Sequence, residues 1–144
     1  ARDWPAPSPR LVTMAGRTCT PLHFMVSAAV AAAAGSPLAD AVGLYKELAD
    51  ARGGTGFSFH GLAADRAGTR LGALVVQPSL APARLQRLRA RGLREVDLLP
   101  DMRDLPEFLG EAEFQRRFGG VDQPAYRRLA ADIERRLATL ALYR

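Results

Sequence analysis

The side chains best suited to acid–base or metal chemistry lie in the first half of this 144-residue chain. Its only two histidines, His23 and His60, flank a stretch that contains several acidic residues and the only lysine. The candidate polar cluster consists of these residues: His23, Lys46, Glu47, Asp50, His60 and Asp65. Imidazole and carboxylate groups bind zinc, iron or manganese, and they also act as general acids and bases.

Helical spacing indicates how these side chains can meet. Asp40, Glu47 and Asp50 fall on one face of a predicted helix and form an acidic strip. If the first three predicted helices pack together, we expect His23, Glu47, Asp50 and Asp65 to converge, with His60 at the rim. The candidate metal ligands are therefore His23, Glu47 and Asp65.

Three interpretations of this cluster remain open from the residues alone. It can hold a metal ion, it can act as an acid–base pair tuned by burial, or its charges can bond one another in a structural or binding role. The spacings match no standard ligand motif, since no H-E-x-x-H occurs. The sequence requires no cofactor.

Nucleophile and phosphate-loop chemistry are not favoured. Ser58 lies in G-F-S-F rather than in a G-x-S-x-G elbow after a strand. The turn G-G-T-G, which includes Gly54 and Gly56, lacks the lysine and the preceding strand of a Walker motif. We interpret Gly54, Gly56, Phe57 and Ser58 as a helix stop, a tight turn and the cap of the next helix.

Apolar periodicity and breaker residues predict an all-α fold of about five to six helices in orthogonal or bundle-like packing. A Pro-rich N-terminal lead-in is expected at 1–19, extended over Trp4–Pro9, before one helical domain at 20–144. The irregular connection is predicted at 93–105. The predicted helices cover these ranges: 21–34, 36–52, 59–76, 82–91, 106–118 and 122–140. The predicted N-caps are Thr20, Ser36, Ser58 and Asp122.

Two helix faces have a distinctive composition. Small residues recur four apart at Ala64, Gly68 and Gly72, a spacing that lets another helix approach closely. Apolar stripes are predicted on the second and last helices. Their members are Leu38, Ala41, Val42, Tyr45 and Leu48 on the second, and Leu129, Ile133, Leu137 and Leu140 on the last.

Composition limits the function classes. The net charge is +5, carried almost entirely by arginine, so an anionic lipid surface is a candidate partner. Nucleic-acid binding is not favoured, because the densest basic run, at 84–94, contains no aromatic residue. The lone Cys19 allows neither an internal disulfide nor a cysteine-based zinc site. The most apolar stretch, at 24–34, is too short to span a bilayer, so no transmembrane helix is predicted.

Several short motifs follow one another in a characteristic order across residues 20–72, and they are His23-Phe24, Lys46-Glu47, Asp50, Gly56-Phe57-Ser58, Leu62, Asp65 and Gly68. In this order they resemble the YfiM-like bacterial envelope lipoproteins and, distantly, the VanZ-like membrane proteins. The family's aspartate-lysine pair before the histidine is absent here, and His60-Gly61 stands where it has an aspartate before the leucine.

The resemblance implies a periplasmic or outer-membrane-associated location and no particular reaction. We therefore expect a helical cell-envelope protein with a non-enzymatic binding or structural role. Its partners would be an envelope protein or an anionic lipid surface. The alternative is a metal-binding protein or hydrolase that uses the His/Glu/Asp cluster.

Overall fold

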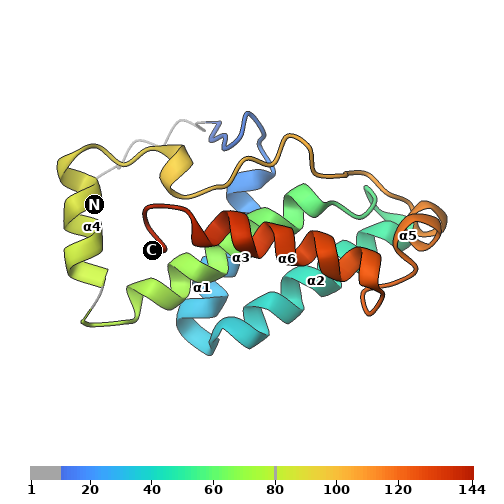
Figure 1. Cartoon of the computed structure of the whole chain (residues 1–144), viewed down its shortest axis with the longest axis horizontal. Coiled ribbons are helices and arrows are strands. Elements are labelled where there is room, and N and C mark those ends of the chain that lie inside the picture. Colours follow the sequence, from blue (N-terminus) through green and yellow to red (C-terminus); the bar gives the residue numbers. More distant parts are fainter. Residues whose placement is uncertain (1–10, 80) are drawn as a thin grey trace, which may run out of the picture.

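The computed structural model describes residues 11–79 and 81–144. The predicted Pro-rich lead-in at Trp4–Pro9 lies outside the described residues. Within them the chain is helical, which confirms the predicted all-α fold (Figure 1). The elements, in chain order, are α1 (Thr20–Ala34), α2 (Ser36–Gly53), α3 (Phe59–Val75), α4 (Ala81–Ala90), a 3-10 turn η1 (Glu95–Asp97), α5 (Glu111–Phe118) and α6 (Pro124–Ala138).

The close packing of α1 against α3 is the most extensive contact between helices, and α2 packs on both. Small residues on α3 make it possible, as their spacing predicted. A Cβ atom added at Gly68 would lie 2.0 Å from the carbonyl oxygen of Phe24, and one at Gly72 would lie 2.2 Å from that of Ala28. No side chain fits at either position, so the two backbones touch directly.

A glycine turn before α2 and a side-chain cap on α3 explain where these two helices begin. The predicted Ser36 cap is wrong, since Gly35 is the N-cap of α2 and no side chain caps this helix. Gly35 adopts a φ of 90°, which L-residues rarely tolerate, and it turns the chain between α1 and α2. The Ser58 side chain accepts a hydrogen bond from the Gly61 amide, so the predicted cap of α3 is confirmed. The predicted Thr20 cap is wrong, since Cys19 precedes α1 and makes no side-chain cap bond.

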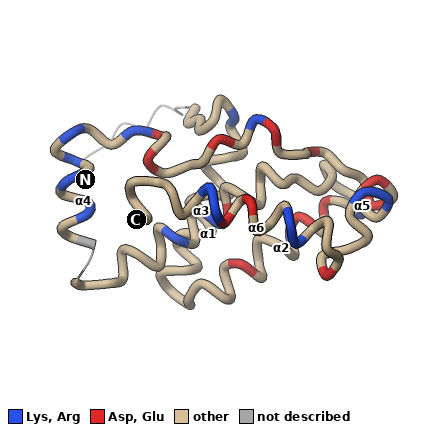
Figure 2. Tube along the Cα trace, in the orientation of Figure 1, with Lys and Arg blue, Asp and Glu red and all other residues tan. Residues whose placement is uncertain are grey.

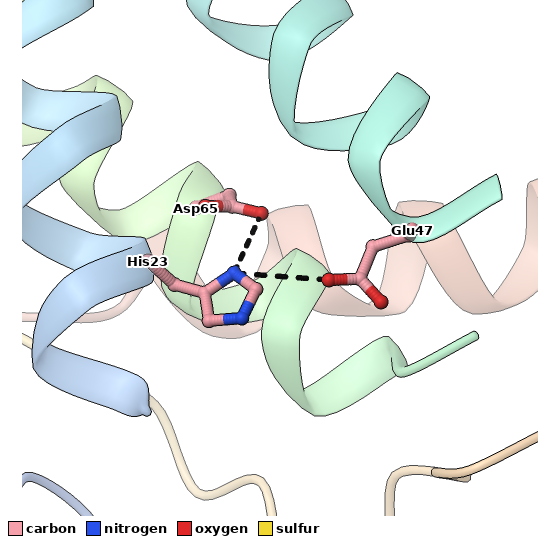
Figure 3. Close-up of side chains that lie close together, drawn as sticks. All are labelled: His23, Glu47 and Asp65. Atoms are coloured by element: carbon pink, nitrogen blue, oxygen red, sulfur yellow. Dashed lines mark hydrogen bonds and ion pairs between the residues drawn. The ribbon is translucent and has the colours of Figure 1, made fainter. Parts of the chain in front are cut away.

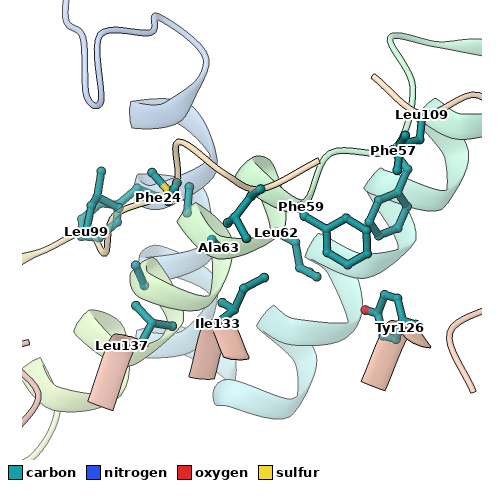
Figure 4. Close-up of a cluster of buried hydrophobic side chains, with 14 of the residues drawn as sticks. Phe24, Phe57, Phe59, Leu62, Ala63, Leu99, Leu109, Tyr126, Ile133 and Leu137 are labelled. Carbon is teal, nitrogen blue, oxygen red and sulfur yellow. The ribbon is translucent and has the colours of Figure 1, made fainter. Parts of the chain in front are cut away.

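Aromatic side chains fill the core between α3, α5 and α6 (Figure 4). Phe57 stacks on Phe114 with 4.5 Å between ring centroids, and Phe59 lies 4.8 Å from Phe118 in a tilted arrangement. The predicted α6 stripe faces this core, where Ile133 and Leu137 are buried. Burial of these large apolar side chains stabilises the association of the helices.

The helix predicted at 106–118 is too long at its start. Only Glu111–Phe118 is helical, and Leu109 instead pairs with Phe57 in a short antiparallel bridge. The Phe57 amide donates to the Leu109 carbonyl at 2.7 Å, and the Leu109 amide donates back at 3.0 Å. Tertiary pairing thus overrides the Pro106 start signal. A Cβ at Gly56 would lie 2.5 Å from the Phe108 backbone, so only glycine allows this approach.

The last helix is also shorter than predicted. Gln123, and not Asp122, is its N-cap, and the helix ends at Ala138 before a turn that includes Leu140. In that turn Tyr143 donates a hydrogen bond to the Ala67 carbonyl of α3 at 2.9 Å. The C-terminal turn is thereby fastened to the central helix.

Most of the apolar stripe predicted on α2 faces outward, and of its large side chains only Leu48 packs against the core. Leu38, Val42 and Tyr45 are 50%, 44% and 74% exposed. The helix instead buries Ala39, Gly43 and Glu47, because α3 approaches on that side and accepts only small side chains or a hydrogen-bonded carboxylate. The apolar pattern of α2 therefore misidentifies its buried face.

The described end of the N-terminal lead-in folds back on the body of the molecule. Met14 and Arg17 form a tight turn through Ala15 and Gly16, both at positive φ. Arg17 reaches Glu107 at 2.7 Å. Among the described residues, no helix combines the length and hydropathy that a membrane span needs.

Candidate functional site

Three helices each contribute one side chain to a cluster of potential metal ligands. His23 comes from the first turns of α1, Glu47 from α2 and Asp65 from α3 (Figure 3). The Nδ1 atom of His23 lies 3.2 Å from Asp65 Oδ2 and 3.7 Å from Glu47 Oε1. Each of the three residues offers one potential ligand atom within 4.8 Å of those of the other two. We call these three residues the His/Glu/Asp cluster; the structure brings them together as their spacing predicted.

Lys46 lies on the other side of the imidazole ring and joins it to the acidic strip. Its Nζ atom is 3.1 Å from His23 Nε2, 3.2 Å from Glu47 Oε1 and 2.9 Å from Asp50 Oδ2. An ammonium group can only donate, so Nε2 of His23 accepts. Nδ1 then carries the proton and donates toward Asp65, which makes the imidazole neutral in this arrangement.

Glu47 is the most deeply buried acid of the cluster, with no exposed surface. Its Oε2 atom accepts a hydrogen bond from the Ser58 amide at 2.8 Å. Burial raises the pKa of the Glu47 carboxyl above its ordinary value, although the Lys46 charge and the Ser58 amide act against this rise. A carboxylate in such a place needs positive charge nearby to stay ionised.

The pKa of Lys46 is also raised, and for an ammonium group this favours the charged form. Burial of the ammonium group opposes the charged form, but the hydrogen bond to Asp50 and the charge of Glu47 outweigh it and raise the pKa. Lys46 is therefore cationic at neutral pH and supplies the cluster's positive charge.

Asp65 is held by α1 and approached closely by α2. Ser27, one turn after His23, donates its hydroxyl to Asp65 Oδ1 at 2.8 Å, which leaves Oδ2 toward the ring. Asp65 packs on Gly43, where an added Cβ would lie 3.0 Å from Asp65 Oδ2. The carboxylate therefore has one fixed orientation.

Two glycines of the site were missed by the sequence prediction. A Cβ at Gly61 would lie 2.6 Å from Glu47 Oε1 and 3.1 Å from His23 Cε1, and Gly43 makes room for Asp65 as described. The signal for Gly61 was its place in the small-residue series of α3, seven residues before Gly68. Gly43 gave no such signal, because it stands alone within α2.

A pocket of about 210 Å³ adjoins the cluster. His23, Ser27, Lys46 and Asp65 provide its polar wall, and its other lining residues are Leu22, Val26, Val42 and Gly43. The pocket gives a small molecule direct access to His23 and Asp65.

The two remaining acids of the predicted strip have separate partners. Asp50 belongs to the site only through Lys46. Asp40 forms an ion pair with Arg66 of α3, and burial raises the pKa of the Asp40 carboxyl despite the arginine charge. The predicted strip therefore does not act as one acidic surface.

His60 does not join the His/Glu/Asp cluster. It is 5% exposed, and its Nδ1 atom lies 3.7 Å from Glu107 Oε1. Burial lowers the pKa of His60, although the Glu107 charge opposes this change. The ring of His60 therefore contacts the 106–110 segment rather than the carboxylates of the cluster.

The predicted turn residues position the cluster from outside. Gly54 and Gly56 end α2 by donating backbone hydrogen bonds to the Asp50 carbonyl at 2.8 and 3.0 Å. Phe57 anchors the turn in the core, and Ser58 binds Glu47 through its amide.

A scan of protein-family models, a search of curated proteins and a search of solved structures each found no significant match to this chain.

Proposed function

We propose that this protein binds one divalent transition-metal ion through His23 Nδ1, Glu47 Oε1 and Asp65 Oδ2. Binding requires the other tautomer of His23, in which the proton moves from Nδ1 to Nε2 and the Lys46 ammonium turns away from that nitrogen. The observation that carries the proposal is that His23, Glu47 and Asp65 each offer a ligand atom within 4.8 Å of the other two. Two ligands about 2.1 Å from a metal ion lie about 3.4 Å apart at a tetrahedral angle. The separations of His23 Nδ1 from Asp65 Oδ2 and from Glu47 Oε1, 3.2 and 3.7 Å, lie close to that value.

The charges of the site favour a divalent cation. Glu47, Asp50 and Asp65 contribute three negative charges when ionised, and Lys46 contributes one positive charge. When the His23 imidazole is neutral, the site therefore has a net charge of two negative charges. Within the described ranges, no arginine forms an ion pair with any of these three carboxylates. A dication would balance the remainder in a partly buried place, where an unbalanced charge is costly.

The ligand set narrows the choice of metal. One imidazole with two carboxylates and no thiolate suits zinc, iron(II) or manganese(II). Ser27 holds Asp65 by a hydrogen bond, as outer-shell groups do in metal sites. The adjoining pocket favours hydrolysis as a second candidate function, because it would let water or a substrate reach an open coordination position.

Lys46 makes the proposal specific. Its ammonium group lies 3.2 Å from Glu47 Oε1, one of the proposed ligand atoms. A metal ion and this ammonium therefore compete for the same oxygen. Replacing Lys46 with methionine should tighten metal binding, whereas a purely structural cluster would lose stability and gain no affinity.

The test is calorimetric titration of protein purified without an affinity tag and freed of metal by a chelator. We expect one manganese(II), zinc(II) or iron(II) ion to bind per chain, and we expect Asp65→Asn to weaken that binding at least about tenfold. Glu107→Gln is the matched control, since it alters the other His/Glu pair of the molecule. Absence of binding, or equal losses in both variants, would contradict the proposal.

The cell-envelope location implied by the family resemblance stays a prediction alongside this function. Fractionation of cells that express the full-length gene tests it, with recovery in the envelope fraction as the expected result. Recovery in the cytosol alone would contradict the location and leave the metal site unaffected.

A further inference from the structure

The outward surface of α1 and the first part of α2 carries large apolar side chains and few charges. Between Arg17 and Asp40 the sequence contains no aspartate, glutamate, lysine or arginine. We call the following exposed residues the α1–α2 face: Leu22, Met25, Val26, Leu38, Val42 and Tyr45. In Figure 2 the turn between α1 and α2 is correspondingly tan.

Helix α1 is apolar on both of its sides. Its inner side buries Phe24, Ala28 and Ala31 against α3, while Leu22 and Met25 on the outer side are 67% and 59% exposed. A helix that is apolar all round is usually covered on all sides. A contiguous exposed apolar surface commonly marks a site that meets a membrane or a partner.

The pocket beside the His/Glu/Asp cluster connects this face to the polar site. Leu22, Val26 and Val42 belong to the face and also line the pocket, whose polar wall includes His23 and Lys46. At roughly 30 Å³ for each water, its 210 Å³ holds about seven water volumes. It can take a polar head group, but a lipid's hydrocarbon chains must lie outside it, against the face.

We propose that the pocket receives the phosphate head of an anionic membrane phospholipid whose acyl chains lie against the α1–α2 face. This inference rests on the proposed metal site. With a dication bound, the site's formal charge rises from two negative charges to zero, and both the metal and Lys46 attract a phosphate oxygen.

The edge of the face fits a lipid interface. Tyr45 is 74% exposed. The next residue in the sequence, Lys46, lines one side of the pocket. Tyrosine and lysine side chains commonly stand at membrane surfaces, with an apolar body and a polar end. A protein partner covering the same face would close the pocket, so lipid is the occupant that also makes use of the polar site.

The test is flotation of the whole chain with vesicles of phosphatidylglycerol or phosphatidylcholine, at moderate salt, with manganese(II) or with a chelator. We expect binding to phosphatidylglycerol vesicles with manganese and a loss of about tenfold or more for the double variant V26N/V42N. Val96→Asn is the control, because Val96 is 62% exposed and does not line this pocket.

Four results overturn the inference. They are no vesicle binding by metal-loaded protein, equal weakening by Val96→Asn and the double variant, equal binding in chelator, and a stable dimer whose formation V26N/V42N abolishes. Calorimetric manganese titration of the same samples separates the two proposals. Metal binding without vesicle binding overturns only the lipid inference, whereas absence of metal binding overturns the proposed function as well.

Discussion

Replacing Gly68 with alanine should separate α1 from α3 and disrupt the candidate site at the same time. The added Cβ would lie 2.0 Å from the Phe24 carbonyl oxygen, whereas carbon and a carbonyl oxygen normally approach to about 3.3 Å. The α1 backbone must therefore retreat by about 1.3 Å (3.3 minus 2.0) near Phe24. His23 is the preceding residue, so its 3.2 Å contact with Asp65 would open beyond hydrogen-bond reach.

The expected change in stability follows from two opposing effects. Overpacking against a backbone atom costs about 3 kcal/mol, the upper end of the usual range, because a carbonyl group cannot rotate away as a side chain does. Alanine returns about 1 kcal/mol of helix propensity relative to glycine. The net loss is about 2 kcal/mol, which lowers the melting temperature by roughly 4–8 °C in a chain of this size.

Denaturant and thermal unfolding measure this loss, with Gly53→Ala as the matched control. A Cβ at Gly53 meets nothing within 4 Å, and Gly53 is helical outside the left-handed region. That variant should be neutral or slightly more stable. The account of α1–α3 packing fails if Gly68→Ala loses less than about 0.5 kcal/mol, or if both variants behave alike.

Three further predictions concern pH, the C-terminal turn and a second packing glycine. Burial raises the folded-state pKa of Glu47, so this group favours folding below its unfolded pKa and loses that contribution as pH rises through the folded value. With a chelator present, the free energy of unfolding of Glu47→Gln should therefore rise relative to that of wild type from pH 4 to pH 8, as measured by urea unfolding. A difference between the two proteins that stays constant over this pH range would argue against this role. Tyr143→Phe removes a hydrogen bond to the Ala67 carbonyl and should lower the free energy of unfolding by about 1 kcal/mol, as measured with denaturant. A change near zero would show that this bond does not hold the C-terminal turn against α3. Gly72→Ala should also destabilise, since its Cβ would lie 2.2 Å from the Ala28 oxygen, and a neutral effect would mean that the helices separate freely.

Most of the helical architecture is accessible from the sequence because its signals are local. Gly35 ends one helix, Ser58 caps another, and Gly68 and Gly72 predict a close crossing of helices. The helix predicted to begin at Pro106 shows the limit. Pairing of Leu109 with Phe57 is a contact between distant segments, and no local pattern encodes it.

The candidate site was predictable to a similar degree. The two rare histidines and the helical spacing of the acids led to the prediction that His23, Glu47 and Asp65 meet, and the three residues do lie together in the structure. The outward direction of Val42 and Tyr45 was not predictable, because an apolar stripe does not reveal which neighbour it meets. The partner of His60 is likewise a residue of the non-helical 106–110 segment, and its position depends on tertiary pairing.

The most direct test of the metal site is a crystal structure grown with manganese(II) and recorded at the manganese absorption edge. We predict one anomalous peak about 2.2 Å from His23 Nδ1, Glu47 Oε1 and Asp65 Oδ2, with the Lys46 ammonium displaced from Glu47. A map without a peak at these atoms, in which Lys46 still bridges His23 and Glu47, would contradict the proposed function.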